Sequence, residues 1–119
     1  MGKNPLVTIM VRNSFRVKSH EFGCPRVFGI SVNTTFGSML CLNAYIQHTT
    51  GVGAKDLEKA LSHEKKEFSF IILGMDSNGH SELWGPAKQG TNRVGMMVED
   101  VLGGNDMVVV NDPESAETF

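Results

Sequence analysis

The sequence predicts an α+β domain in which apolar strands and amphipathic helices pack as layers. Two strand-like runs, residues 27–33 and 39–46, are separated by a short glycine-containing segment, which predicts an antiparallel hairpin. Residues 54–66 carry one narrow apolar stripe at helical spacing with charged residues around it. Residues 69–74 form a continuous apolar run ended by a glycine, as expected of a strand buried on both faces. This alternation of strands and helices indicates a layered domain.

Three further elements complete the expected order. Residues 6–11 (LVTIMV) predict a first strand, which polar residues close. Residues 91–102 predict a second helix, because apolar side chains recur at helical spacing, with Thr91 or Asn92 as the N-cap and two glycines as the stop. Residues 107–110 predict a final buried strand that ends at a turn. A chain of 119 residues corresponds to one domain at most, or to a piece of one.

The composition is that of an ordinary globular protein, with 40% hydrophobic and 20% charged residues. The net charge is -2, because 11 Lys and Arg face 13 Asp and Glu, so no strong non-specific binding of nucleic acid is implied. The first 18 residues carry four basic side chains and no acidic one. That excess is compatible with a solvated surface and with a DNA contact, and the first is the commoner arrangement.

The cysteines and the apolar runs bear on the compartment. Cys24 and Cys41 show no metal-ligand spacing and no CxxC pair, which predicts reduced thiols. We find no apolar signal core and no apolar stretch of membrane-spanning length. The sequence therefore predicts an intracellular protein that is not secreted and is not bound to a membrane.

The chemistry-bearing segment follows the apolar run at residues 69–74. Asp76 and Asn78 come just past the strand, and extended residues at i and i+2 point the same way. A carboxylate there would bind a divalent cation or orient a water, and an amide would contact phosphate oxygens. Asp-Ser-Asn-Gly is also a common turn sequence, which is the simpler interpretation of these residues alone. An EF-hand calcium loop is excluded, because Ser81 replaces the glycine at its sixth position and Ala87 the glutamate at its twelfth.

A series of short motifs runs from Gly74 to the end of the chain. They are Asp76-Ser77-Asn78, Gly79-His80-Ser81, Trp84-Gly85, the helix start Asn92-Arg93-Val94-Gly95, a strand ending in Asn111, and the stretch from Pro113 to Phe119. In this order and spacing they resemble the endonuclease domain of non-LTR retrotransposons, a branch of the endonuclease/exonuclease/phosphatase family. The resemblance covers nearly the whole chain and is most specific over residues 71–111. One departure is Met75, which stands between Gly74 and Asp76.

The resemblance implies a fold and a domain organisation. We expect part of a four-layered α/β sandwich, in which two mainly antiparallel sheets are flanked by helices. Residues 1–119 would be a central fragment of a single domain. Strands that supply an Asn and a metal-binding Glu would precede residue 6, and the motifs with the catalytic Asp-His pair would follow residue 119. A fragment without those groups is expected to turn over little or no substrate.

The resemblance also implies a function and site residues. The activity would be Mg²⁺- or Mn²⁺-dependent hydrolysis of DNA phosphodiesters, a nicking reaction associated with a reverse transcriptase in the nucleus. Asp76 would bind the metal and position the attacking water, while Asn78 and Tyr45 would contact the scissile phosphate. His80 and Trp84 are the remaining candidates for substrate contacts.

Each of these roles has a structural alternative. Tyr45 has the pattern of a strand aromatic with a hydrated hydroxyl, His80 that of a loop residue, and Trp84 that of a side chain packing the loop on the sheet. The alternative for the whole chain is a decayed or domesticated fragment without catalysis, acting at most as a binding module. The sequence predicts neither an oligomeric state nor a DNA target site.

Overall fold

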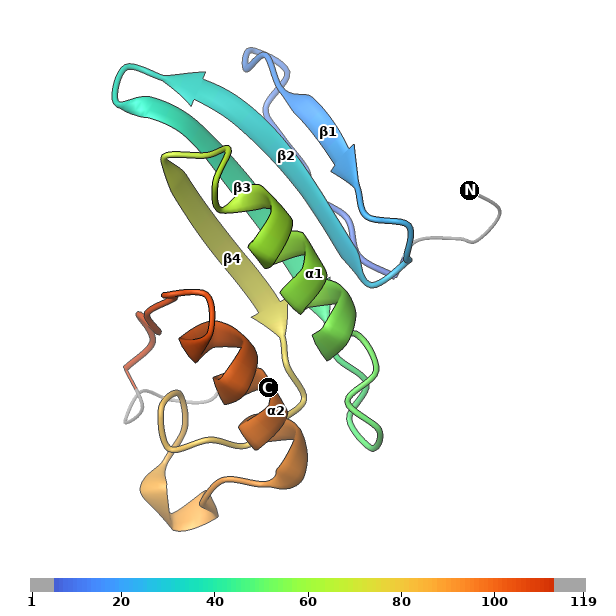
Figure 1. Cartoon of the computed structure of the whole chain (residues 1–119), viewed down its shortest axis with the longest axis vertical. Helices are drawn as coiled ribbons and strands as arrows, with labels where there is room; N and C mark the ends of the chain where they lie inside the picture. Colours follow the sequence, from blue (N-terminus) through green and yellow to red (C-terminus); the bar gives the residue numbers. More distant parts are fainter. Residues whose placement is uncertain (1–5, 113–119) are drawn as a thin grey trace.

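The computed structural model describes residues 6–112, which form one four-stranded sheet and two α-helices (Figure 1). In chain order the elements are β1 (Lys18–Glu21), β2 (Val27–Thr34), β3 (Gly37–Tyr45), α1 (Ala54–Glu64), β4 (Phe70–Asp76), the 3-10 helix η1 (Ala87–Gln89) and α2 (Arg93–Gly103). The sheet order is β1-β2-β3-β4; the first three strands are antiparallel, and β4 pairs with β3 in parallel. The helix α1 makes the crossover that a parallel pair requires.

The predicted hairpin is confirmed as β2 and β3. Thr34 pairs with Gly37, so the turn consists of Thr35 and Phe36. The hydroxyl of Thr34 accepts the Phe36 N–H at 3.1 Å and donates to the Gly37 carbonyl at 2.7 Å. Gly37 has φ 132°, a backbone conformation that favours glycine. The turn chemistry thereby fixes the register of the central strands.

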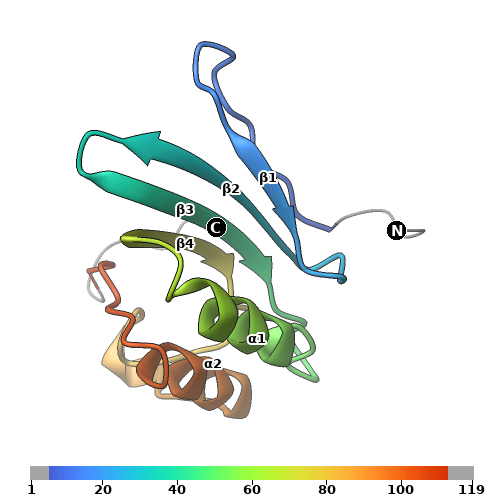
Figure 2. The same ribbon diagram turned by 45° about the horizontal axis from the view of Figure 1, so that its top comes forward.

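Both helices cover the same face of the sheet (Figure 2). There the side chains of Leu40 and Leu42 pack with Leu57 and Leu61 of α1 and Val98 of α2, and none of the five is more than 2% exposed. Burial of such a side chain contributes about 1.5–3 kcal/mol. The predicted helices at residues 54–66 and 91–102 are thus confirmed, with slightly shifted ends. None of the helices in residues 6–112 has the length and apolarity needed to cross a membrane.

The prediction of a first strand at residues 6–11 is wrong. This segment forms no strand; it is held at Leu6, whose N–H donates to the Pro25 carbonyl at 2.8 Å, and at Thr8, whose carbonyl accepts from the Asn43 amide at 2.9 Å. The strand that pairs with β2 on the side away from β3 is β1, a polar stretch without apolar alternation. Apolar residues in extended order make a strand only where a backbone partner is available.

The prediction of a last strand at residues 107–110 is also wrong. Val108 is 82% exposed and Val110 is 93% exposed, and the segment pairs with no described strand. The neighbouring prediction for residues 69–74 needs correction too. The strand exists as β4, but it lies at the edge of the described sheet, and Phe70 and Ile72 are 46% and 57% exposed. Residues 6–112 therefore form one sheet with helices on one side, and the second sheet of the expected sandwich is not among them.

Candidate functional site at the ends of β3 and β4

Tyr45 and Asp76, the last residues of β3 and β4, are neighbours across the two strands. They are directly paired in the parallel register, so their side chains leave the sheet on the same side. That side is opposite to α1 and α2, because the alternate residues Leu42 and Ala44 face the helices and are buried. We call it the helix-free face. Asp76 is exposed, and its carboxylate makes no hydrogen bond or ion pair with the other residues in 6–112.

Asn78 reaches the same corner by a different geometry from the one expected. The strand ends at Asp76, and Asn78 has φ 50°, so the rule that extended residues at i and i+2 point alike does not apply. Instead the Asn78 Nδ2 donates to the Ile46 carbonyl at 2.9 Å, while the Ile46 N–H donates to the Asp76 carbonyl at 2.9 Å. The Asp76 carbonyl and the Asn78 side chain are thus both hydrogen-bonded to backbone groups of Ile46, the residue that follows Tyr45.

The loop after β4 is fastened to the start of α2. Asn92 is the N-cap of this helix, and its side-chain Oδ1 accepts the N–H of Gly95 at 2.8 Å and that of His80 at 3.1 Å. The Asn92 N–H donates in turn to the His80 carbonyl at 3.0 Å. The His80 imidazole itself is on an exposed residue, and the contacts of this residue with α2 are made by its backbone. His80 is therefore held in the loop by hydrogen bonds of its backbone and not of its imidazole.

Two glycines allow the loop and the helix to approach this closely. A Cβ on Gly95 would lie 1.9 Å from the His80 carbonyl oxygen, and a Cβ on Gly79 would lie 2.7 Å from the Gly95 nitrogen. Neither residue has a positive φ, so the space and not the backbone conformation demands glycine. The contact is backbone against backbone.

Ser81 forms the second attachment of the loop to α2. Its side chain is 2% exposed, its Oγ donates to a carboxylate oxygen of Glu99, and the same Oγ accepts the Leu83 N–H at 3.0 Å. A hydrogen bond to a charged acceptor is roughly twice as strong as one between neutral groups. Sequence inspection assigned no role to Glu99, because a single acidic residue on a helix usually faces solvent.

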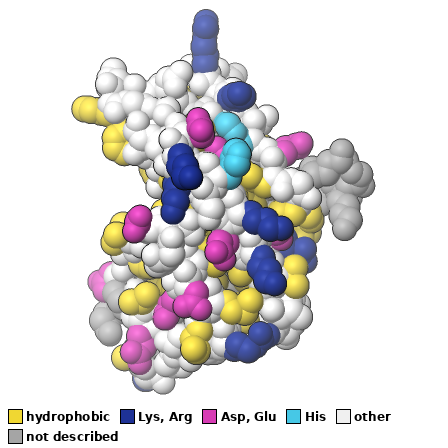
Figure 3. Space-filling model, viewed as in Figure 1, with side chains coloured by type: hydrophobic (Ala, Val, Ile, Leu, Met, Phe, Trp, Pro, Cys, Tyr) yellow, Lys and Arg dark blue, Asp and Glu magenta, His cyan; other side chains and the backbone are white. Residues whose placement is uncertain are grey.

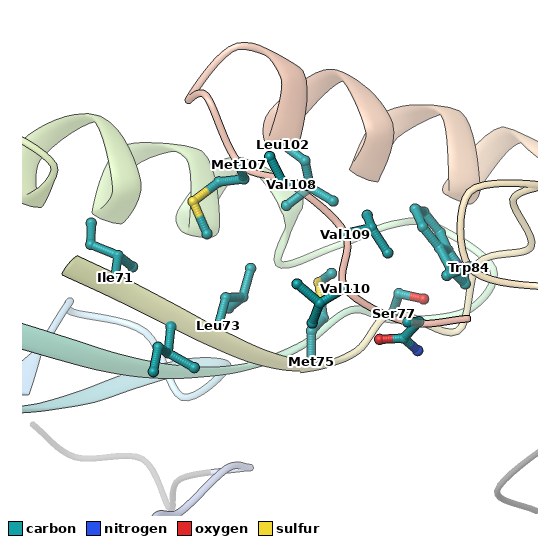
Figure 4. A pocket seen from close by; sticks show the side chains of 12 residues that line it. Ile71, Leu73, Met75, Ser77, Trp84, Leu102, Met107, Val108, Val109 and Val110 are labelled. Atoms are coloured by element: carbon teal, nitrogen blue, oxygen red, sulfur yellow. The ribbon is translucent and has the colours of Figure 1, made fainter. Parts of the chain in front are cut away.

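Trp84 lies on the helix side of the sheet. Its indole N–H donates to the Gly79 carbonyl at 3.0 Å, and its ring lines a cavity of about 420 Å³ between β4, α2 and residues 107–111 (Figure 4). The cavity is lined mainly by apolar side chains, among them Leu73, Met75 and Val109, with the Ser77 hydroxyl at one end. Asp76 points to the other face. Trp84 is therefore placed as a packing residue of the loop.

The donor set for a cation is small. Asp76 offers a carboxylate and Asn78 an amide oxygen, both of them hard ligands suited to Mg²⁺. Within residues 6–112 no three His, Cys, Asp or Glu side chains come together as a metal-binding group. Cys24 and Cys41 are free thiols on half-buried residues. The oxygens present fit a hard cation, but they make up only part of a coordination shell.

Comparison with known proteins bears on this arrangement of strands, helices and loop. No protein-family model matches the sequence, and no curated protein matches it. The solved structures do contain a related fold. The fold is similar to that of an endonuclease domain. One solved structure with this similarity is the endonuclease domain of TRAS1, a telomere-specific non-LTR retrotransposon, which matches with a TM-score of 0.65 and 16% sequence identity.

The match covers most of this chain but only part of the TRAS1 chain. It covers 83% of this chain and 46% of the TRAS1 chain, so this chain spans less than half the length of that neighbour. At 16% identity the likeness concerns the fold alone. The expected resemblance is supported at that level: a mixed sheet with two helices that corresponds to part of a retrotransposon endonuclease domain.

Proposed function

We propose that this chain carries part of the site of a metal-dependent phosphodiesterase that nicks DNA, of the non-LTR retrotransposon type. The observation that carries the proposal is the pairing of Tyr45 with Asp76, whose exposed carboxylate has no partner within residues 6–112, and the hydrogen bond from Asn78 to Ile46, the residue after Tyr45. A carboxylate without an internal partner at the end of a strand has no structural task there, and a rigid strand end is a suitable mount for a reactive group. The likeness to the TRAS1 domain supports the same assignment.

Each of the three side chains has a distinct task in this proposal. A bound Mg²⁺ would supply charge stabilisation at the phosphate. Asp76 binds that cation or orients the attacking water. Asn78 keeps one amide hydrogen and its Oδ1 beyond the bond to Ile46, and the Tyr45 hydroxyl is a further donor for phosphate oxygens. Hydrogen bonds from such neutral donors position the phosphate without competing for the metal.

The remaining ligands are proposed to come from a second sheet. The helix-free face exposes large apolar side chains on β4, with Phe70 at 46% and Ile72 at 57%. Two sheets pack through apolar faces of this kind to form a sandwich. More than half of the TRAS1 chain lies outside the match. We infer that strands packed on this face complete the sandwich and bring the missing carboxylates to Asp76.

The charge distribution does not mark out a separate DNA-binding surface on the face seen in Figure 3. Figure 3 shows Lys and Arg interspersed with Asp and Glu over the face seen there, without one continuous basic patch. DNA-binding surfaces gather positive charge along one face or groove. In this proposal the substrate phosphate would meet the molecule at the corner formed by Tyr45, Asp76 and Asn78, because of the side chains that lie there.

Manganese-induced line broadening tests the site without requiring turnover. Mn²⁺ added to the ¹⁵N-labelled chain should broaden the amide signals of Tyr45, Asp76 and Asn78 first. Asp76→Asn should remove this effect because it removes the carboxylate proposed to bind the cation, while Asp100→Asn, an exposed aspartate on α2, should preserve it. Equal broadening at many acidic residues, unaltered in Asp76→Asn, would sink the assignment.

A plasmid-nicking assay then tests whether the chain is sufficient by itself. With one carboxylate and one amide oxygen for the cation, residues 1–119 should nick supercoiled DNA slowly or not at all in Mg²⁺. Efficient nicking that Asp76→Ala abolishes would contradict the proposal that other strands supply essential ligands.

A non-catalytic binding module is the second candidate function. It is favoured by one observation, namely that residues 6–112 hold no group of three potential metal ligands. In that case Mn²⁺ would leave the Asp76 corner unaffected, and DNA binding measured by fluorescence anisotropy would not depend on divalent cations.

A further inference from the structure

We propose that Asn92 and Glu99 are positioning residues that hold Asn78 at the ends of β3 and β4 through the loop that follows Asp76. Neither side chain contacts Asp76 or Asn78 in the hydrogen bonds described above. Both act on the backbone of the loop, at His80 and Ser81. The catalytic consequence of this arrangement rests on the proposed function, but the positioning itself does not.

The two residues belong to one stripe of α2 that faces the loop. Asn92, Gly95 and Glu99 are spaced i, i+3 and i+7, so they lie on the same side of the helix within two turns. The core side of the helix is formed by other positions, including Val94, Val98 and Val101. The polar stripe and the apolar stripe thus have separate partners, the loop and the sheet.

Asn92 couples the cap of α2 to the loop. One oxygen, Oδ1, accepts the N–H of Gly95 inside the helix and the N–H of His80 in the loop. The Asn92 N–H donates to the His80 carbonyl, so both backbone polar groups of His80 are hydrogen-bonded to one residue. Loss of the Asn92 side chain therefore removes a bond to the helix and a bond to the His80 peptide together.

Glu99 holds the loop one residue further along. The Ser81 hydroxyl, which is 2% exposed, donates to the Glu99 carboxylate and accepts the N–H of Leu83. Without the carboxylate this buried hydroxyl would lose its acceptor, and an unsatisfied buried polar group drives the segment towards water. The stripe therefore fastens the loop at two adjacent residues.

Asn78 needs this support because of its own backbone. A φ of 50° is a left-handed conformation that asparagine adopts more readily than other non-glycine residues but still at a cost, so contacts around Asn78 help to retain it. Only Gly79 separates Asn78 from the residues fastened to α2, and that glycine touches the backbone of Gly95. Release of the loop should let Asn78 relax and withdraw its amide from Ile46.

The test uses ¹⁵N NMR of the whole chain and follows the side-chain amide signals of Asn78 and the backbone amide of His80. In Asn92→Ala the His80 N–H should exchange with solvent about tenfold faster or more, since it loses its acceptor. In both Asn92→Ala and Glu99→Ala the Asn78 side-chain signals should move to the position of a free amide. Asn92→Asp and Glu99→Gln keep an acceptor oxygen and should restore both signals.

Asp100→Ala is the matched control. Asp100 is the exposed neighbour of Glu99 on the same helix, and its substitution should leave the signals of Asn78 and His80 unchanged. Unchanged Asn78 signals in both alanine variants would overturn the inference, as would equal changes in Asp100→Ala. Amide signals of β2 and β3 report whether each variant is folded, and Glu99→Ala provides a test that leaves the helix cap intact.

Manganese titration of the same variants separates this inference from the proposed function. If Mn²⁺ binds at Asp76, Asn92→Ala should weaken that binding about tenfold, as removal of supporting groups around a metal site does, and Asn92→Asp should recover it. If the parent chain shows no Mn²⁺ effect at Asp76, the proposed function fails, while the Asn78 signals still decide whether α2 positions the loop.

Discussion

The two faces of the sheet differ in what their side chains do. Under α1 and α2, Leu40 is 0% and Leu42 2% exposed, and they belong to the continuous apolar core. On the helix-free face of the neighbouring strand, Ile72 is 57% exposed, and the unpartnered carboxylate of Asp76 lies at the strand end. The buried face therefore supplies most of the stability of residues 6–112, and the helix-free face carries the side chains for which we propose a metal, a substrate and a second sheet as partners.

Truncation of one apolar side chain on each face tests this difference most strongly. Leu40→Ala should lower the free energy of unfolding by about 2–5 kcal/mol, because it leaves a cavity in a closed core. Ile72→Ala, one strand away on the other face, should cost less than about 1 kcal/mol, since much of that side chain already meets water. Urea denaturation followed by circular dichroism measures both values. Equal losses would show that the helix-free face is as closely packed as the core.

Two glycines of α2 provide a comparison of intermediate size. Gly95→Ala would force a methyl group to 1.9 Å from the His80 carbonyl and should destabilise the fold by about 1–3 kcal/mol or more. A Cβ on Gly103 meets nothing within 4 Å, so Gly103→Ala should be neutral or stabilise by up to about 1 kcal/mol through helix propensity. Thermal unfolding distinguishes the two. A neutral Gly95→Ala would contradict the close contact between the loop and the helix.

The smallest effect is expected at Asp76 itself. Asp76→Asn removes a charge that has no partner among the described residues, so the free energy of unfolding should change by no more than about 0.5 kcal/mol. A thermal scan of the variant beside the parent chain checks this. A large loss would mean that the carboxylate stabilises the fold, and its assignment as an outward-facing ligand would be wrong.

Elements with local signals were predicted well from the sequence. The helices α1 and α2 follow from apolar periodicity, and the hairpin from two runs that flank a glycine. Of the two predicted N-cap candidates, Thr91 and Asn92, the structure has Asn92. The failures concern segments whose state depends on distant partners. Residues 6–11 and 107–110 are apolar enough for strands but pair with no strand in the described part of the chain, whereas the polar β1 pairs with β2.

In the candidate site, too, features with a local sequence signal were predicted, and features that depend on distant partners were not. Asp76 and Asn78 were singled out because they follow an apolar strand, and Tyr45 by the family resemblance. Their proximity depends on the register of β3 with β4, which two separate segments set together. The left-handed backbone of Asn78 and the bond from Ser81 to Glu99 arise from packing of the loop on α2. The Asn-Gly pair in the sequence permits the left-handed backbone of Asn78, but no local pattern specifies the bond from Ser81 to Glu99.

The connection between β3 and β4 has a consequence for the order of folding. β2 and β3 are joined by Thr35 and Phe36 alone, whereas β4 can pair with β3 only after the whole of α1 has been accommodated between them. Closing the longer loop costs more chain entropy, so the hairpin should form before the parallel pair. Pulsed hydrogen exchange during refolding would then find β2 and β3 protected first. Until β4 pairs with β3, Tyr45 and Asp76 are not neighbours, so the candidate site is assembled only in the late stage of folding.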